Sequence, residues 1–330
     1  MKAGIAGGMR WSGAAALTRA AMRRNGGFWI VGYHRVVADF ADAAAGSIPA
    51  ALIGRSMLER HLDWIGRRFE FVTLDALADR LEGGGSCRRP AAAITFDDGY
   101  RTLYHLAFPI LRRKGIPATL FVVTDTVGTG KLLLHDRLHH LLSRAWTRWA
   151  SPRREIDRRS AGPVPRTSPV GSAGTAGRDG PHRALRHLLE SHSRSTLERL
   201  ADELESDLGL DERVVEDHRP LSWEMLLEMR RAGISVGSHS RTHALLTRED
   251  AGTVRDELAE SRRALGSRLG GPIRHFAYPN GWFDRAIVRQ VETAGYRCGL
   301  TSCRHRDPRR PLLTLPRTLL WEHSALGPFG

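Results

Sequence analysis

The sequence predicts an α/β protein in which about seven strands alternate with helices to form a TIM-like (β/α)7 barrel. Two observations predict this fold. Apolar and β-branched runs at residues 28–34, 91–96 and 118–123 are separated by segments with helical spacing of leucine and isoleucine. The polar residues capable of chemistry come directly after such runs, and parallel barrels carry their active sites at the carboxyl ends of their strands.

The first half of the chain repeats the strand and helix pattern. Residues 28–34 form an aromatic and β-branched run, and the run at 91–96 ends at Asp97. The helix expected after Asp97 ends at Gly115, where a charged last turn is followed by a glycine. The other elements expected here are helices at 57–67 and 74–81 and strands at 69–72 and 118–123.

The pattern breaks between residues 128 and 220, which we interpret as an insertion. Helical patterns occupy its two ends, at 132–149 and 184–208. Its middle, residues 151–180, is rich in Pro, Gly, Ser and Arg and too poor in apolar residues to pack a core, so we expect it to be disordered or mobile. The expected organisation is a basic tail over residues 1–27 and a barrel over 28–330, interrupted by the insertion at 128–220.

The repeat resumes after the insertion. The elements expected here are helices at 223–231, 247–265 and 284–294, strands at 234–236, 275–277 and 297–300, and short strand pieces that flank 315–317. These strands complete the count that a barrel requires.

Composition limits the partners. The net charge of +14 suits anionic partners such as phospholipid head groups, nucleic acid or acidic glycans, although a genome-wide preference for arginine and alanine explains the excess equally well. Three cysteines without C-x-x-C spacing indicate neither a disulfide framework nor a thiolate zinc site. No signal-peptide core and no membrane-spanning run is evident, so we expect a cytoplasmic protein. Residues 14–22 could form a basic helix on a membrane surface, with a solvated tail as the alternative.

Two adjacent carboxylates follow the run at 91–96. Asp97 and Asp98 cannot both face one side unless the backbone turns, and Gly99 permits that turn. Two carboxylates held close together repel unless a cation or a proton neutralises one of them. The alternative is a solvated Asp-Asp-Gly turn, and the rest of the chain must decide between the two.

A histidine pair follows the strand at 234–236. His239 and His243 are four residues apart, so one helical turn would place both imidazoles on the same face. Fifteen histidines make chance pairs common, and we interpret His135 with His139 as a solvated helix face. The pair at 239 and 243 lies on the same barrel rim as the two aspartates. Two histidines and one aspartate would make a three-ligand site with open positions for a catalytic divalent metal.

The remaining carboxylate beside such a metal is a candidate general base. His34 lies at another strand end and is a candidate acid for a leaving nitrogen, although a lone histidine more often has a structural role.

The motifs Thr-Phe-Asp-Asp-Gly at 95–99 and His-Ser-x-x-His at 239–243 resemble the first two motifs of the polysaccharide deacetylases with a NodB homology domain, carbohydrate esterase family 4. The resemblance covers residues 28–321 apart from the insertion. It implies a distorted (β/α) barrel, a divalent metal, usually zinc with cobalt, nickel or manganese as alternatives, and removal of N-acetyl groups from N-acetylhexosamine glycans. It also implies Asp97 as the base and Asp98, His239 and His243 as metal ligands.

The chain departs from the family pattern in two places. The stretch at 276–281 lacks the arginine that usually steadies the base, and His323 matches the carboxy-terminal Leu-x-His motif poorly. Instead, Tyr-His-Arg-Val at 33–36 and Leu-Pro-Arg at 315–317 resemble the exopolysaccharide, poly-N-acetylglucosamine branch, in which an early histidine is the acid. We therefore expect His34 to be the acid and Arg317 to pair with Asp97.

The function favoured by these residues is metal-dependent N-deacetylation of a glycan or a lipid-linked sugar. Tyr278 and Trp282 could form an apolar wall for the substrate, with barrel-rim packing as the alternative, and Pro279 and Asn280 complete the candidate substrate contacts. The other functions left open are deacylation or deformylation of another amide and glycan binding without catalysis. No nucleic-acid partner is expected, because that role would rest on charge alone.

Overall fold

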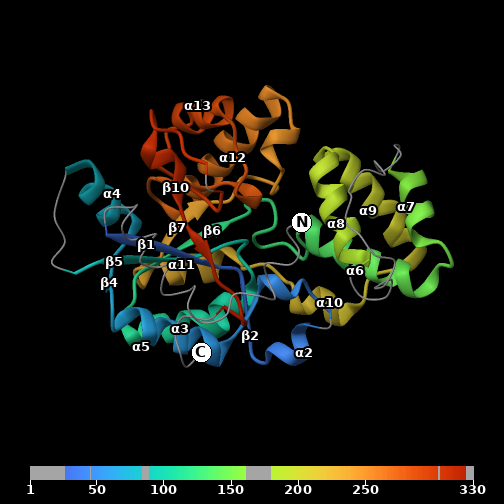
Figure 1. Ribbon diagram of the computed structural model, residues 1–330, viewed down its shortest axis with the longest axis horizontal. Helices are drawn as coiled ribbons and strands as arrows, with labels where there is room; N and C mark the ends of the chain where they lie inside the picture. Colours follow the sequence, from blue (N-terminus) through green and yellow to red (C-terminus); the bar gives the residue numbers. More distant parts are fainter. Residues whose placement is uncertain (1–26, 45, 84–88, 161–179, 304, 325–330) are drawn as a thin grey trace.

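The computed structural model describes residues 27–44, 46–83, 89–160, 180–303 and 305–324. Its main feature is a parallel sheet with the order β10-β9-β8-β7-β6-β5-β1-β11, and β4 pairs with β5 outside this path (Figure 1). The strands are β1 (Phe28–Tyr33), β4 (Glu70–Phe71), β5 (Ala91–Phe96), β6 (Ala118–Val122), β7 (Ser235–Ser238), β8 (His275–Ala277), β9 (Cys298–Thr301), β10 (Leu315–Pro316) and β11 (Thr318–Leu319).

The two edges of this sheet are joined by one short segment. β10 pairs with β9 and β11 pairs with β1, although only Arg317 separates β10 from β11 in the chain. The segment therefore bridges the edges and nearly closes the sheet into a barrel. The (β/α)-barrel prediction is confirmed; of the strand pieces predicted to flank 315–317, β11 follows this stretch, whereas β10 lies within it.

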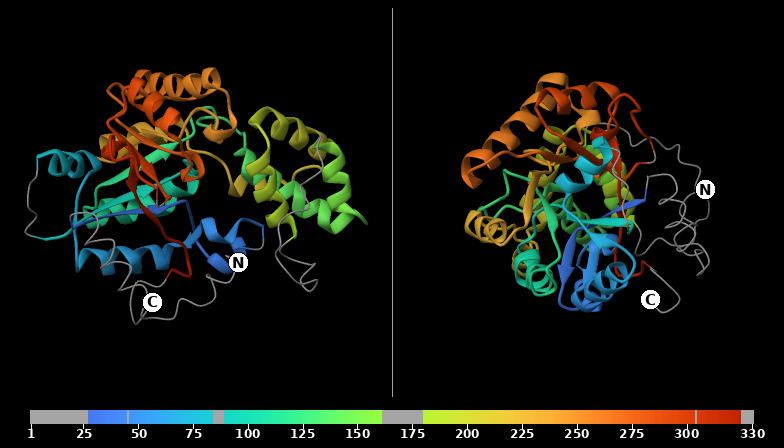
Figure 2. Two further views of the ribbon diagram at one scale, coloured as in Figure 1. Left: turned by 45° about the horizontal axis from the view of Figure 1, so that its top comes forward. Right: turned by 90° about the vertical axis from the view of Figure 1, so that its left-hand side faces the viewer.

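Helices cover the outside of the sheet (Figures 1 and 2). They are α3 (Arg55–Gly66), α4 (Leu74–Gly83), α5 (Phe108–Lys114), α11 (Trp223–Arg231), α12 (Ala251–Leu269) and α13 (Arg285–Thr293). α5 ends as predicted, with Gly115 in the left-handed region at φ 64°. None of the described helices has the length and apolar character needed to cross a bilayer.

Shorter elements complete the barrel. A two-stranded parallel sheet consists of β2 (Arg35–Val37) and β3 (Leu52–Gly54). The remaining short helices are α2 (Phe40–Ala44), η1 (Pro49–Ala51), the π-helical turn η2 (Leu103–Ala107), η3 (Leu246–Arg248), η4 (Pro279–Gly281) and η5 (Pro311–Thr314).

The alternation of side chains along β1 and β5 separates two apolar clusters. Trp29, Val31, Ala92 and Ile94 belong to the large cluster that includes the helices, whereas their neighbours, including Ile30, belong to a second cluster with residues of β6, β8 and β9. Side chains two residues apart share a face of a strand. Thr95 and Asp97 therefore continue the face of the second cluster, as do Gly32 and His34.

Four helices form a unit beside the barrel, at the right of Figure 1, which we call the helical segment. They are α6 (Leu134–Arg148), α7 (Pro152–Arg159), α8 (Gly180–Ser191) and α9 (Arg194–Leu208), and the short helix α10 (Glu212–Asp217) follows them in the chain and lies nearer α2. The segment has its own apolar cluster, which includes Leu138, Leu141, Leu200 and Leu204. The helices predicted at 132–149 and 184–208 are confirmed as α6 and as α8 with α9, whereas the domain boundaries stay a prediction.

The expectation of disorder at 151–180 is wrong for its first part, which forms α7. Ile156 is 2% exposed and packs in the cluster of the helical segment, and the guanidinium of Arg159 lies 5.0 Å from the ring of Trp149. Arg159 also forms an ion pair with Asp207 of α9 at 2.7 Å, so apolar, stacking and charged contacts together hold α7 against the helical segment. Residues 161–179 and the proposed membrane-surface helix at 14–22 lie outside the described residues.

Candidate active site

Strand register brings His34 and Asp97 together. β1 and β5 pair in parallel from Phe28 with Ala91 to Tyr33 with Phe96, so the next residues, His34 and Asp97, are neighbours at the carboxyl ends. Their side chains approach as this register requires, with Nε2 of His34 3.8 Å from Oδ2 of Asp97. Asp97 is 1% exposed. Burial lowers the pKa of His34 to about 4, an effect that the charge of Asp97 only partly offsets.

Arg317 binds Asp97 with two parallel hydrogen bonds. Nη1 donates to Oδ1 at 2.7 Å, and Nη2 donates to Oδ2. A Cβ at Gly32 would lie 2.6 Å from the side chain of Leu319, so glycine at this position leaves room for β11 beside the arginine. Burial alone would raise the pKa of Asp97, but Arg317 and the neighbouring histidines outweigh it and hold this pKa below its usual range. The expected pairing of Arg317 with Asp97 is present.

The backbone turns at Asp98 and Gly99, as the motif predicted. Asp98 has φ 72° and Gly99 has φ 78°, both in the left-handed region. An aspartate in this region is strained, and such residues concentrate at functional sites. The turn brings Asp98 to the histidine pair, and Nε2 of His239 lies 3.7 Å from Oδ2 of Asp97 as well.

Asp98 is a buried acid that lacks a partner for one oxygen. It is 3% exposed, and its Oδ1 has no hydrogen bond among the described residues. Burial raises its pKa well above the usual range, and the charges of Asp97 and Asp136 add to that effect. A cation beside Oδ1 would satisfy the oxygen and restore the carboxylate charge.

His239 and His243 lie on an irregular turn, so the prediction of a helical turn is wrong. Ser240 and His243 have φ values of 66° and 65°, which an α-helix does not contain. The rings nevertheless meet, with centroids 4.8 Å apart. Oγ of Ser240 accepts a hydrogen bond from the backbone N–H of His243 at 3.0 Å, which stabilises the bend.

Glu257 of α12 holds the same turn from behind. Its carboxylate accepts from the backbone N–H groups of Arg241 and Thr242, both at 2.9 Å, and from the hydroxyl of Thr242 at 2.6 Å. Glu257 is 2% exposed, so these bonds are shielded from water. The sequence offered no sign of this role, because Glu257 occupies an ordinary position in a helical pattern.

Asp98, His239 and His243 form the one group of three or more potential ligands found among the described residues, with ligand atoms within 4.8 Å of one another. Oδ1 of Asp98 lies 3.6 Å from Nε2 of His239 and 3.5 Å from Nε2 of His243. Nδ1 of His239 donates to the carbonyl of Ala277 at 2.8 Å, which leaves Nε2 without a proton and able to bind a metal. The donor set fits a divalent ion such as zinc.

His135 of α6 also lies at this site, so its interpretation as a solvated helix face is wrong. Its side chain is 15% exposed, with Nε2 4.0 Å from Oδ2 of Asp98. Its ring centroid lies 5.0 Å from that of His243. Local spacing shows which residues share a helix face, but not what that face contacts, so the sequence could not reveal this position.

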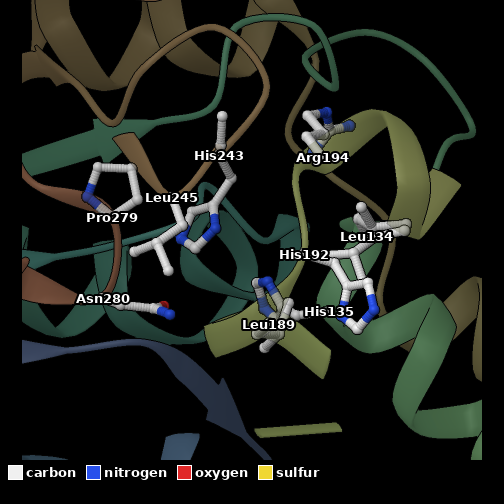
Figure 3. Close-up of a pocket in the computed structure, with 11 residues that line it drawn as sticks. Leu134, His135, Leu189, His192, Arg194, His243, Leu245, Pro279 and Asn280 are labelled. Carbon is white, nitrogen blue, oxygen red and sulfur yellow. The ribbon is translucent and has the colours of Figure 1, made fainter. Parts of the chain in front are cut away.

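A small pocket adjoins His243 between the barrel and the helical segment (Figure 3). Its lining includes Pro279 and Asn280 from the barrel and His135 and Arg194 from the helical segment. Two of the predicted substrate residues therefore face a pocket beside the candidate metal ligands.

The packing alternative holds for Tyr278. Its side chain is fully buried in the large apolar cluster, and its hydroxyl donates to the carbonyl of Leu313 at 2.9 Å. The apolar wall expected from Tyr278 is therefore absent. Trp282 is partly buried and is not among the residues that line the pocket.

Known proteins share both the sequence pattern and the fold. The chain is 18% identical over 251 residues to YxkH of Bacillus subtilis strain 168, which carries a provisional polysaccharide deacetylase name; this match covers 76% of the chain and 58% of YxkH. It is 31% identical over 105 residues to the poly-beta-1,6-N-acetyl-D-glucosamine N-deacetylase of Staphylococcus epidermidis, a match that covers 29% of the chain and 36% of that enzyme. The chain thus matches well under two thirds of either relative's length.

Two solved structures resemble the structure of this chain. The deacetylase PplD of Streptococcus pyogenes, in complex with acetate, superposes with a TM-score of 0.57 at 16% identity, over 90% of this chain and 93% of that chain. IcaB of Ammonifex degensii superposes with a TM-score of 0.54 at 20% identity, over 89% and 91%. Because both identities are below 25%, these two matches show that the proteins share a fold and nothing further.

The family model named polysaccharide deacetylase matches residues 84–151 and 187–299, more than half of the chain. These ranges contain both the Asp97-Asp98 pair and the His239-His243 pair. The chain belongs to the polysaccharide deacetylase family.

Proposed function

We propose that this protein is a metal-dependent N-deacetylase that hydrolyses the acetamide of N-acetylhexosamine units in a glycan. The observation that carries the proposal is that two adjacent acids have different surroundings. Asp97 is held by Arg317, and Asp98 faces two histidines with an unpartnered oxygen. The family and the match to a poly-N-acetylglucosamine deacetylase support an exopolysaccharide as substrate.

Asp98, His239 and His243 are the proposed ligands. A divalent ion bound there would supply a Lewis acid for the acetyl carbonyl and lower the pKa of a bound water. Zinc is the expected metal because two imidazoles and one carboxylate suit it, and cobalt, nickel or manganese are alternatives.

Asp97 is the proposed general base. Arg317 keeps its carboxylate charged and fixes the plane in which its oxygens lie, so Asp97 can accept the proton of the attacking water. The pairing replaces the arginine that residues 276–281 lack.

His34 is the proposed group that passes a proton to the leaving nitrogen. Its lowered pKa makes it neutral near pH 7, so it has no spare proton at the start of the reaction. Nε2 of His34 lies 3.8 Å from Oδ2 of Asp97, so a proton that Asp97 takes from water can be passed to His34. Moving it from His34 to nitrogen as the C–N bond breaks gives acetic acid and a free amine, and Asp97 is restored as a carboxylate.

The test is acetate release from N-acetylglucosamine oligomers with β-1,6 and β-1,4 linkages. We expect the protein to release acetate when loaded with Zn²⁺ or Co²⁺, to lose activity when a chelator removes the metal, and to retain little activity as His34→Ala or Arg317→Ala. If the loaded protein releases no acetate from any of these glycans, the proposal is wrong. Full activity in His34→Ala would remove the proton-transfer role of that residue alone.

A further inference from the structure

The two oxygens of Asp98 face different neighbours. Oδ1 faces His239 and His243, whereas Oδ2 faces Nε2 of His135 at 4.0 Å. We propose that His135, held by Tyr100 and Asp136, is a positioning residue that orients Asp98 for metal binding. This inference rests on the metal site of the proposed function and assigns a role to a residue outside the three ligands.

Hydrogen bonding identifies which nitrogen of His135 carries a proton. The hydroxyl of Tyr100 donates to Oδ2 of Asp136 at 2.7 Å, so its single hydrogen is used. The contact of 3.3 Å between the Tyr100 oxygen and Nε2 of His135 then requires Nε2 to be the donor. Nε2 lies 3.7 Å from Oδ2 of Asp136 as well.

A protonated Nε2 cannot bind a metal, because its lone pair is used for the N–H bond. His135 therefore does not supply a fourth ligand atom. Its N–H group lies among carboxylate oxygens that include Oδ2 of Asp98. An N–H dipole on this side favours the rotamer in which Oδ1 points at the two ligand histidines. Partners behind a ligand commonly orient it in this way.

The surrounding charges explain why Asp98 needs such support. Three buried carboxylates meet here, and Asp97 has Arg317 while Asp136 has Tyr100. Asp98 has no ion pair with an arginine or lysine in the part of the chain that the structure describes, and its salt-bridge partners there are histidines alone. Asp136 repels the charge of Asp98, whereas the Tyr100 hydroxyl and the N–H group of His135 favour it.

Asp136 is itself anchored on the far side. Burial would raise its pKa, but His135, His218, the Tyr100 hydroxyl and Arg35 together lower it. Arg35 donates to His218, and both side chains are less than 5% exposed. Buried charges that reach back to β2 therefore favour an ionised Asp136 beside His135.

The helical segment is therefore part of the proposed metal site. His135 lies in the first turn of α6, and Arg194 at the start of α9 donates to the carbonyl of Thr242, next to the ligand His243. The backbone N–H of Arg194 also donates to Glu249 at 2.8 Å. Two contacts from the segment therefore flank the ligands.

The test measures the Zn²⁺ dissociation constant of the full chain by competition with a chelator. We expect His135→Ala to weaken binding about 10- to 100-fold, in the range found for partners of metal ligands. Asp136→Asn should weaken binding less and in the same direction. His135→Gln should recover part of the affinity, because its amide can donate from the same place. His187→Ala, on α8 of the same segment, is the matched control and should bind zinc like the wild type.

The Co²⁺ absorption spectrum separates positioning from direct ligation. The positioning role predicts the same coordination number in the wild type and His135→Ala. Unchanged zinc affinity in both His135 variants would overturn the proposal, and so would a changed cobalt coordination number combined with an unaffected Asp136→Asn. These measurements use no glycan, so a protein that binds zinc normally but releases no acetate would refute the proposed function and leave this test valid.

Discussion

The barrel and the helical segment supply the candidate site in different ways. The barrel provides Asp97, Asp98, His239 and His243 from strand ends, where pairing and left-handed residues fix the backbone. The helical segment provides His135 from a helix that packs around its own apolar cluster. The proposed reacting groups therefore lie where strand pairing fixes the backbone, whereas the proposed supporting group comes from a separately packed unit.

Asp97→Asn, in the barrel, should have the largest effect on activity, because it removes the proposed base and leaves the proposed ligands in place. We expect the turnover number for acetate release to fall about 10²- to 10⁴-fold, the usual contribution of a general base. Zinc affinity should remain near the wild-type value. Asp125→Asn is the control, since that carboxylate is 54% exposed. Normal turnover in Asp97→Asn would contradict the assignment of the base.

Leu200→Ala tests whether the helical segment is an independent unit. Leu200 is fully buried, and truncating such a leucine costs about 2–5 kcal/mol. We expect amide hydrogen exchange to accelerate in α6, α8 and α9 and to stay slow in β5 and β6.

Leu265→Ala is the matched variant in the barrel, because Leu265 is equally buried on α12. It should accelerate exchange in the barrel strands. Equal acceleration in both regions for both variants would mean that the two clusters unfold as one.

Glu257→Gln tests the support that the barrel gives to its own ligand. The amide should keep some of the three hydrogen bonds to the turn at residues 241–242 but lose their charge assistance. We expect Zn²⁺ affinity to fall about 10-fold. Glu260→Gln, on the same helix and 44% exposed, should leave it unchanged. If both variants bind zinc equally well, Glu257 does not position His243.

The smallest expected effect is a decrease in the free energy of unfolding at acidic pH, to which one histidine of each region contributes. Burial lowers the pKa of His61 in the barrel and of His139 in the helical segment to about 4 each. An unfolded histidine has a pKa of about 6.5, so the unfolded chain binds more protons between those values and stability falls as the pH drops from about 6.5 to 4.

The loss at pH 5 should be about 1–2 kcal/mol per histidine relative to pH 7. Thermal unfolding at the two pH values measures it, and His61→Gln and His139→Gln should each reduce the difference. A pH difference that neither variant changes would assign the acid sensitivity to other groups.

The site residues that could be predicted from the sequence are those that belong to local motifs. A strand followed by Asp-Asp-Gly and a strand followed by His-x-x-x-His located Asp97, Asp98, His239 and His243, and the missing arginine directed attention to Arg317. The bend at Ser240 and His243 was invisible because neither residue is a glycine. The position of His135 could not be predicted because helix spacing does not reveal a tertiary neighbour. The helix α7 could not be predicted because composition does not reveal the contacts that Ile156 and Arg159 make with neighbouring helices.

Arg317 joins two events that are usually separate. It is the one residue between β10 and β11, and it is also the partner of Asp97. Until β11 pairs with β1, the carboxylate has no guanidinium beside it, and burial would favour its neutral form. Pairing of β11 with β1 therefore also brings Arg317 to the proposed base. A chain in which β11 has separated from β1 would retain its motifs but lack the guanidinium that holds the proposed base, so barrel closure and assembly of the candidate site would be one event.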